Sequence, residues 1–184
     1  MDVVQSAPQT VFLAGDEAGL YLQATTCYVW SPTGQTPRVR ADPGRAKTNF
    51  YGALNLQTGK DIAMRSDLMN AEVSAQYLEK LLEANPEVPL ILFWDRAPWH
   101  RGQPIDNVLK ENPRLKIIFF PTASPDLNPQ EHVWKAVRKE VSHNHLEARL
   151  PDLADRFLDK LNSGTFKSSL LDHYDYNTLR PMFI

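Results

Sequence analysis

The spacing of hydrophobic residues divides this chain near residue 70. Upstream of that point, short apolar runs alternate with turn-forming residues, a pattern that is typical of strands joined by turns. It predicts strands at residues 11–14, 28–30, 37–40 and 49–56. The first of these strands is expected to deliver Asp16 at its end.

Downstream of residue 70, apolar residues recur at the three- and four-residue spacing of helices. One helix is expected to begin after Asn70, a typical N-cap residue, and to stop at Asn85 and Pro86. Its apolar face consists of Val73, Tyr77, Leu78, Leu81 and Leu82. Further helices are predicted at residues 103–111, after Asn128 and at 151–161, with strands at 90–94 and 115–120. Strands that alternate with helices indicate a mixed α/β fold whose later strands lie parallel.

Length and composition indicate one domain with a full hydrophobic core. The chain has 184 residues, of which 42% are hydrophobic and 23% charged, which is ordinary for a globular protein. We expect a loose tail at residues 1–9, a domain at 10–163 and a C-terminal extension at 164–184. No apolar run approaches the roughly 20 residues that span a bilayer, so the sequence predicts a cytoplasmic protein without a membrane partner. The single Cys27 excludes an internal disulfide and a cysteine-based zinc site.

The net charge of −2 is unusual for a protein that binds DNA by itself, because phosphate contacts need lysine and arginine. Basic residues nevertheless gather in two places, and each group is either a solvated surface or a site of DNA contact. The candidates for DNA contact are Arg38, Arg40, Arg45 and Lys47 in one group and Lys135 and Arg138 in the other.

Three acidic residues at the ends of predicted elements are candidates for catalysis and for metal binding: Asp16, Asp95 and Glu131. Asp95 ends the apolar run of the strand at 90–94, and Glu131 is the third residue of the helix that Asn128 caps. Carboxylates are the ligands that Mg²⁺ and Mn²⁺ prefer. Three of them that converge would suit a pair of such ions in phosphodiester cleavage.

Each candidate also has a structural interpretation. Asp16 fits a turn, Asp95 fits a cap on the turn that follows its strand, and Glu131 fits a capping box with Asn128. Glu17 is a poorer metal ligand than Asp16, because neighbours on a strand point to opposite faces. His100 and His132 are candidates for positioning water or phosphate, with packing as the alternative.

Four segments together resemble the catalytic, three-carboxylate domain of the mariner-type transposase superfamily, in particular its bacterial insertion-sequence branch. They are DEAGL at residues 16–20, YVWSPTGQTP at 28–37, WDRAPWH at 94–100 and SPDLNPQEHVW at 124–134. The resemblance covers about residues 10–160 in order. One departure is Arg96, where the family usually has asparagine.

The resemblance implies a ribonuclease H-like fold, a mixed five-stranded sheet flanked by helices, which the order of predicted elements also fits. It implies metal-dependent DNA strand cleavage and strand transfer with Mg²⁺ or Mn²⁺, in two ions, held by Asp16, Asp95 and Glu131. The implied partners are transposon ends, target DNA, a second copy in a homodimer and a helix-turn-helix module. No segment before Val11 could form that module, so we expect a split reading frame with the module on a separate chain, a truncated copy or a cut piece of a longer protein. Two alternatives remain: a ribonuclease H-like nuclease that does not transpose, and an inactive remnant that only binds.

Overall fold

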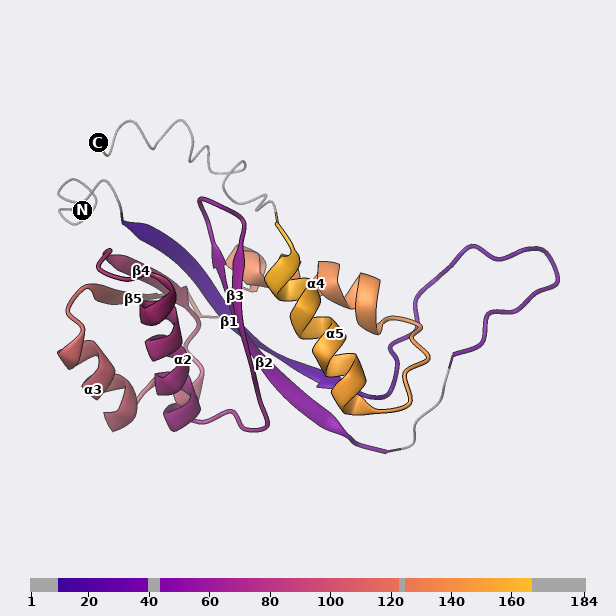
Figure 1. Cartoon of the computed structure of the whole chain (residues 1–184), viewed down its shortest axis with the longest axis horizontal. Helices are drawn as coiled ribbons and strands as arrows, with labels where there is room; N and C mark the ends of the chain where they lie inside the picture. Colours follow the sequence, from indigo (N-terminus) through magenta and orange to yellow (C-terminus); the bar gives the residue numbers. More distant parts are fainter. Residues whose placement is uncertain (1–9, 40–43, 123–124, 167–184) are drawn as a thin grey trace.

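A computed structural model describes residues 10–39, 44–122 and 125–166 (Figure 1). In chain order the elements are β1 (Val11–Tyr21), β2 (Lys47–Asn55), β3 (Asp61–Ser66), α2 (Ala71–Ala84), β4 (Leu90–Trp94), η1 (Pro98–His100), α3 (Gln103–Glu111), β5 (Leu115–Phe119), η2 (Pro125–Leu127), α4 (Pro129–Val137), η3 (Arg138–Ser142) and α5 (Leu150–Ser163). The predicted tail at 1–9, residue Arg40 and residues 167–184 of the predicted extension lie outside the described residues.

The five strands form one mixed sheet in the order β3-β2-β1-β4-β5. β1 pairs antiparallel with β2, and β2 pairs antiparallel with β3. β1, β4 and β5 run parallel, because helical crossovers connect them. The predicted mixed five-stranded sheet flanked by helices is confirmed, and β1 lies at its centre.

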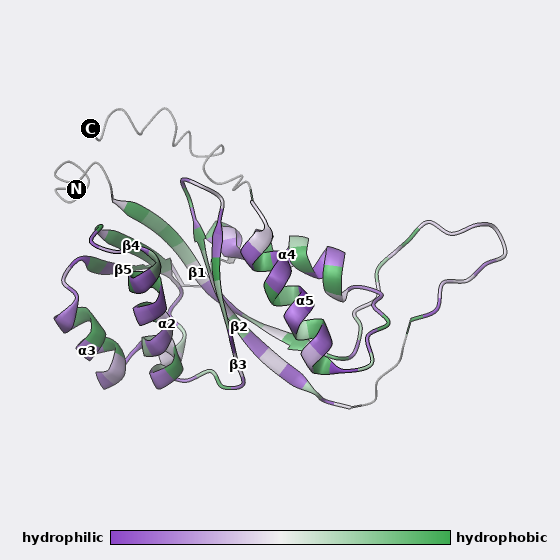
Figure 2. Cartoon of the chain, in the orientation of Figure 1, coloured by the Kyte–Doolittle hydropathy of each residue, from purple (hydrophilic) through white to green (hydrophobic). Residues whose placement is uncertain are grey.

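Helices cover the two faces of the sheet separately. In Figure 1, α2 and α3 lie on one side and α4 and α5 on the other, and each helix has hydrophobic and hydrophilic stripes (Figure 2). Leu13 of β1 belongs to the core under α2 and α3, whereas Ala14 belongs to the core under α4 and α5. The alternation of side chains along β1 therefore feeds two different cores.

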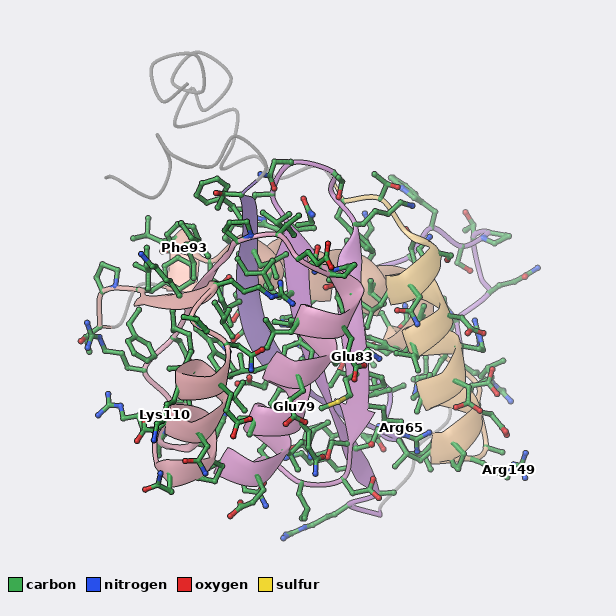
Figure 3. The ribbon with its side chains drawn as sticks, turned by 60° about the vertical axis from the view of Figure 1, so that its left-hand side comes forward. Arg65, Glu79, Glu83, Phe93, Lys110 and Arg149 are labelled. Carbon is green, nitrogen blue, oxygen red and sulfur yellow. The ribbon has the colours of Figure 1, made fainter. Side chains whose placement is uncertain are left out.

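Charged residues on the helices keep to the outside. Glu79 and Glu83 of α2 and Lys110 of α3 are exposed (Figure 3). Arg65 of β3 pairs with Asp155 of α5 at 3.3 Å, which ties that helix to the edge strand. Among the described residues, no helix is long and apolar enough to cross a membrane.

The strand predictions need four corrections. β1 is more than twice as long as predicted, so Asp16 lies inside it rather than at its end. Residues 28–30 form no strand, and Tyr28 and Trp30 are fully exposed. Residues 37–39 are also outside any strand, while β3 was not predicted. Apolar composition in a surface loop was therefore mistaken for a core strand.

The helix predictions are confirmed. Asn70 caps α2 by accepting a hydrogen bond from the Val73 amide at 2.9 Å, and α3 has the predicted limits. The helix after Asn128 is α4, which continues through the π-helical η3, and the last predicted helix is α5.

The long loop between β1 and β2 extends away from the body of the domain (Figure 1). Its base is fastened by Asn144, whose Oδ1 accepts from the Cys27 amide at 3.1 Å and whose Nδ2 donates to the Cys27 carbonyl at 3.0 Å. Cys27 itself is exposed. The loop therefore leaves the domain from a fixed point.

Candidate active site

Asp16 lies where β1 loses one of its two neighbours. On one side Asp16 is opposite Gly52 of β2. On the other side the parallel pairing with β4 ends at Ala14, opposite Phe93. Asp95 is the first residue after β4, so both predicted aspartates follow the point where the pairing of β1 with β4 ends.

The Asp16 side chain points toward α4 and is 9% exposed. Trp134 Nε1 donates a hydrogen bond to Asp16 Oδ2 at 2.9 Å. Burial, together with the charges of Glu131 and Glu17, raises the pKa of Asp16 to about 7, and the Trp134 hydrogen bond opposes the rise. Asp16 is thus a buried carboxyl group with an acidic neighbour and a single indole donor among the described side chains.

Helix α4 reaches Asp16 because the facing position of β2 is a glycine. A Cβ on Gly52 would lie 2.3 Å from Gln130 Nε2 and 2.6 Å from the Trp134 ring. Gln130 Nε2 in turn donates to Asp61 Oδ2 at 3.0 Å, and both side chains are buried. These contacts hold the first turns of α4 against β2 and the start of β3.

Asn128 fixes the beginning of the same helix to β1. Its Oδ1 accepts from the Gln130 amide at 3.1 Å, as an N-cap does, and its Nδ2 donates to the Gly15 carbonyl at 3.0 Å. The side chain is buried, and it bridges the helix start to the peptide that precedes Asp16. The predicted N-cap is confirmed, and the bond to β1 is an addition that the sequence did not indicate.

Glu131 follows in the first turn of α4 and is partly exposed. The Asn128 side chain bonds the second amide of the helix, whereas the Glu131 amide donates to the Asn128 main-chain carbonyl at 3.1 Å. In a capping box the N-cap side chain takes the third amide instead. Glu131 acts electrostatically on Asp16, so the structure brings these two predicted residues together.

Asp95 occupies the turn that follows β4, and its side chain is 49% exposed. Its Oδ1 accepts from the Ala97 amide at 3.0 Å and lies 2.8 Å from His100 Nδ1. The hydrogen bond from His100 lowers the pKa of the Asp95 carboxyl group. The turn-cap interpretation of Asp95 is therefore correct, and it occupies one oxygen of the carboxylate.

His100 is buried, and its ring stacks on Trp94 with centroids 3.6 Å apart. Its Nε2 lies 2.9 and 3.0 Å from the two carboxylate oxygens of Glu17. Burial lowers the pKa of His100, but the hydrogen bonds to Asp95 and Glu17 outweigh it and raise the pKa to about 9. His100 is therefore an imidazolium ion between two carboxylates.

Glu17 is the residue that the sequence interpretation underrated. Its side chain is 4% exposed and points to the opposite face from Asp16, as the strand alternation predicts. Besides His100 it accepts hydrogen bonds from Trp94 Nε1 at 3.2 Å and Trp99 Nε1 at 3.0 Å. The one available signal was three aromatic N–H donors within the short segment WDRAPWH.

The remaining candidates lie around this centre or away from it. His132 is exposed on α4. Arg96 turns toward the end of β5, where its Nε donates to the Phe120 carbonyl at 3.2 Å and its guanidinium group lies 5.5 Å from the Phe119 ring. Arg96 therefore has partners other than Asp95.

The basic candidates for DNA contact do not form one patch on a single element. Arg38 and Arg45 are exposed on the loop between β1 and β2, Lys47 starts β2, and Lys135 is exposed on α4. Arg138 donates from Nη2 to the Gly19 carbonyl at 3.2 Å and so serves partly to hold the helix to β1.

The donor set around Asp16 suits a hard divalent cation. In the described part of the chain, no ion pair with lysine or arginine neutralises Asp16 or Glu131, and the charge of Glu131 contributes to the raised pKa of Asp16. The Asp95 contacts use Oδ1, so Oδ2 remains for another ligand. Carboxylates in this setting fit Mg²⁺ or Mn²⁺.

Comparison with known families agrees with this geometry. The family model of the DDE superfamily endonucleases matches residues 11–154. The chain belongs to this superfamily. The match covers both aspartate-bearing strands and the helix of Glu131, so the family resemblance stated from the sequence is confirmed.

Two related sequences also resemble this DDE domain. A 39 kDa protein of insertion element IS630 from Shigella sonnei is 28% identical over 141 residues, which cover 76% of this chain and 41% of that protein. The protein y4pE/y4sA of Sinorhizobium fredii is 26% identical over 98 residues, covering 53% of this chain and 70% of that protein.

Solved structures of Mos1 transposase have the same fold. Its paired-end complex with the left transposon end matches with a TM-score of 0.65 and 16% identity, covering 95% of this chain and 54% of that one. The catalytic domain of Mos1 mariner transposase matches with a TM-score of 0.56 and 15% identity, covering 95% and 78%. This DDE chain thus spans about half the length of the Mos1 transposase in its complexes.

Proposed function

We propose that this chain is a transposase catalytic domain that cleaves DNA strands and joins them to target DNA, with two Mg²⁺ or Mn²⁺ ions. The observation that carries the proposal is the interaction of the buried Asp16 carboxyl group with the partly exposed Glu131, whose charge adds to burial in raising the pKa of Asp16 to about 7. A cation between them removes the repulsion between the two carboxylates. Membership of the DDE endonuclease superfamily supports the same activity.

In this proposal Asp16, Asp95 and Glu131 are the catalytic residues and the metal ligands. Trp134 orients Asp16, His100 orients Asp95, and the bonds of Asn128 and Gln130 set Glu131 in place. When bound, the cations supply an activated oxygen nucleophile and stabilise the leaving oxygen. Mos1 paired-end complexes solved with Mn and with Mg support this choice of ions.

We further propose that the partners are transposon ends and target DNA, and that the active form is a homodimer assisted by a helix-turn-helix module. Residues 10–163 form the catalytic unit, and exposed Arg38, Arg45 and Lys135 contact phosphates. Binding by this chain alone is then weak, indifferent to sequence and steeply dependent on salt. Titration of DNA duplexes at two salt concentrations measures this directly.

The decisive experiment compares Glu131→Gln with the parent chain. Supercoiled plasmid is incubated with Mg²⁺, Mn²⁺ or EDTA, and a pre-cut transposon end is offered for strand transfer. The glutamine variant is expected to melt near the parent in EDTA and to lose metal-dependent nicking, because an amide lacks the charge that a hard cation requires.

Each outcome separates the candidates. Nicking together with strand transfer supports a transposase, and nicking alone supports a nuclease that does not transpose. If the parent chain does not nick the plasmid with either Mg²⁺ or Mn²⁺, it is an inactive remnant that only binds. Nicking that survives in Glu131→Gln removes Glu131 from the site and contradicts the three-carboxylate mechanism.

A further inference from the structure

Glu17 is a buried carboxylate that the proposed chemistry does not use. Its two oxygens receive hydrogen bonds from three N–H donors, on Trp94, Trp99 and His100, at 2.9–3.2 Å. A buried carboxylate is costly unless its lone pairs are satisfied, and this one is satisfied by groups from one short segment. The arrangement fixes η1 and the turn before it to the middle of β1.

The same group of residues contains a cluster that resembles a metal site. Ligand atoms of Glu17, Asp95 and His100 lie within 4.8 Å of one another. However, the two ring nitrogens of His100 point to different carboxylates, Nδ1 to Asp95 and Nε2 to Glu17. A cation can replace only one of these bonds, and it would compete at Glu17 with two indole N–H groups. The geometry is that of a hydrogen-bonded relay.

The relay ends at Asp95. From Glu17, the contacts run through the buried His100 ring to Asp95 Oδ1, which also accepts from the Ala97 amide. Stacking on Trp94 fixes the plane of the ring. With Oδ1 held by two donors and the ring immobile, the half-exposed Asp95 carboxylate has its other oxygen, Oδ2, set in one direction.

We propose that Glu17 and His100 are positioning residues that orient Asp95 for metal binding, an inference that rests on the proposed function. Glu17 acts through His100, and His100 acts through Asp95. Partners of this kind, one bond removed from a metal ligand, typically change metal affinity or activity by about 10–100-fold when they are replaced. The two adjacent acids of β1 thus have different roles. Asp16 is a metal ligand, and Glu17 holds His100, which in turn orients Asp95.

Two substitutions of His100 separate positioning from packing. The side-chain nitrogen of glutamine lies near the place of imidazole Nε2, and that of asparagine lies near the place of Nδ1. His100→Gln therefore keeps a donor for Glu17 and loses the one for Asp95, whereas His100→Asn keeps the donor for Asp95. Both variants remove the stacked ring, so they are matched in the packing they lose.

The measurement is the rise in melting temperature of the full chain on titration with Mn²⁺, accompanied by plasmid nicking. We expect the half-saturating Mn²⁺ concentration to increase about 10–100-fold in His100→Gln and clearly less in His100→Asn. Melting temperatures in EDTA report the loss of packing separately. Glu17→Gln, which keeps the volume of the side chain, is expected to lie between the two and serves if the His100 variants do not fold.

The outcomes distinguish this inference from the proposed function. A parent chain that nicks DNA, with His100→Gln and His100→Asn equal in their Mn²⁺ response, overturns the positioning role alone. A parent that Mn²⁺ stabilises without nicking overturns the proposed function, and the comparison of half-saturating concentrations still decides the positioning role. A parent that neither binds Mn²⁺ nor nicks overturns both.

Discussion

Asp16 and Glu17 are neighbours on β1, yet their carboxylates have opposite surroundings. Asp16 faces α4, where it has one indole donor and an acidic neighbour, Glu131, and its pKa rises to about 7. Glu17 faces the other core, where Trp94, Trp99 and His100 all donate to it. One carboxylate lacks positive partners, and the other is saturated with donors.

The difference shows how a strand assigns distinct tasks to adjacent acids. A carboxylate whose oxygens already accept hydrogen bonds from protein donors is a poor metal ligand, because a cation would have to displace those donors. A carboxylate that is buried beside another one is unfavourable until a cation arrives. Unfavourable electrostatics is therefore a better guide to a metal ligand than the number of acids in a cluster.

The largest expected effect comes from Asp16→Asn. Metal-dependent nicking should fall by more than the roughly 100-fold that loss of an outer partner costs, because a ligand itself is removed. In EDTA at pH 8 the variant should nevertheless melt above the parent, since the amide can still accept from Trp134 and no longer repels Glu131. Melting curves and nicking rates measured on the same preparation test both statements.

The opposite result for Asp16→Asn would contradict the difference between Asp16 and Glu17. A variant that is less stable than the parent in EDTA at pH 8, while still stabilised by Mn²⁺, would show that Asp16, like Glu17, is not itself a metal ligand. The gain in stability is expected to vanish at pH 5, where Asp16 in the parent is protonated and neutral.

Asp61 sharpens the comparison, because it is a buried acid on the α4 side whose pKa is raised by burial and not by an acidic neighbour. Burial raises the pKa of Asp61 to about 7, and the hydrogen bond from Gln130 opposes the rise. A folded pKa above the unfolded one of 3.8 means that the folded state binds more protons between these values. Stability therefore falls as pH rises from about 4 to about 7.

Asp61→Asn should remove this penalty, so its melting temperature relative to the parent rises from pH 5 to pH 8. A pKa difference of one is worth roughly 1.4 kcal/mol. The response to Mn²⁺ should stay that of the parent, unlike in Asp16→Asn. Asp106→Asn, at an exposed position of α3, is the matched control. A lost Mn²⁺ response in Asp61→Asn would place Asp61 in the metal site.

Much of the fold could be predicted because its helices carry local signals. Asn70 and Asn128 mark helix starts as N-caps, and the apolar spacing after them sets the buried faces. The strands were harder. β1 continues through Gly15, Asp16 and Glu17, where glycine and two acids interrupt the apolar pattern. The buried partners of those polar side chains are distant in the sequence, so the local pattern could not reveal that the strand continues.

The site could be predicted only as far as its motifs reach. Asp95 and Glu131 stood out because each has a distinctive local setting, a strand end and a first helical turn. The anchor at Glu17 depends on a turn that brings Trp99 and His100 back to β1, residues 82 and 83 positions away. Such a convergence follows from the sheet register, which a single sequence does not give.

Gly52→Ala tests whether the close contact of α4 is what creates the Asp16 environment. The added Cβ meets the Trp134 ring at 2.6 Å, and overpacking of this kind costs about 1–3 kcal/mol. Because the indole must move from Asp16, nicking should fall together with stability. Gly34→Ala, in the loop, has open space for its Cβ but strains a backbone with a φ of +83°, so it can lower stability without crowding α4 and should leave nicking unchanged. Full activity in Gly52→Ala would show that α4 tolerates displacement.

The smallest expected effect on stability comes from substitutions of Asn128, and they separate its role as an N-cap from its bond to β1. Asn128→Ala should cost about 1 kcal/mol through the lost N-cap. Asn128→Ser keeps a capping oxygen, so it should recover most of that stability in a denaturant melt, but a serine cannot also reach the Gly15 carbonyl that Asn128 Nδ2 bonds at 3.0 Å. Because this bond holds the helix of Glu131 to the peptide before Asp16, both variants are expected to lose nicking to a similar degree although only one loses stability. Recovery of nicking in Asn128→Ser would mean that the cap alone sets Glu131 against Asp16, and the bond from Asn128 to the Gly15 carbonyl would then have no positioning role.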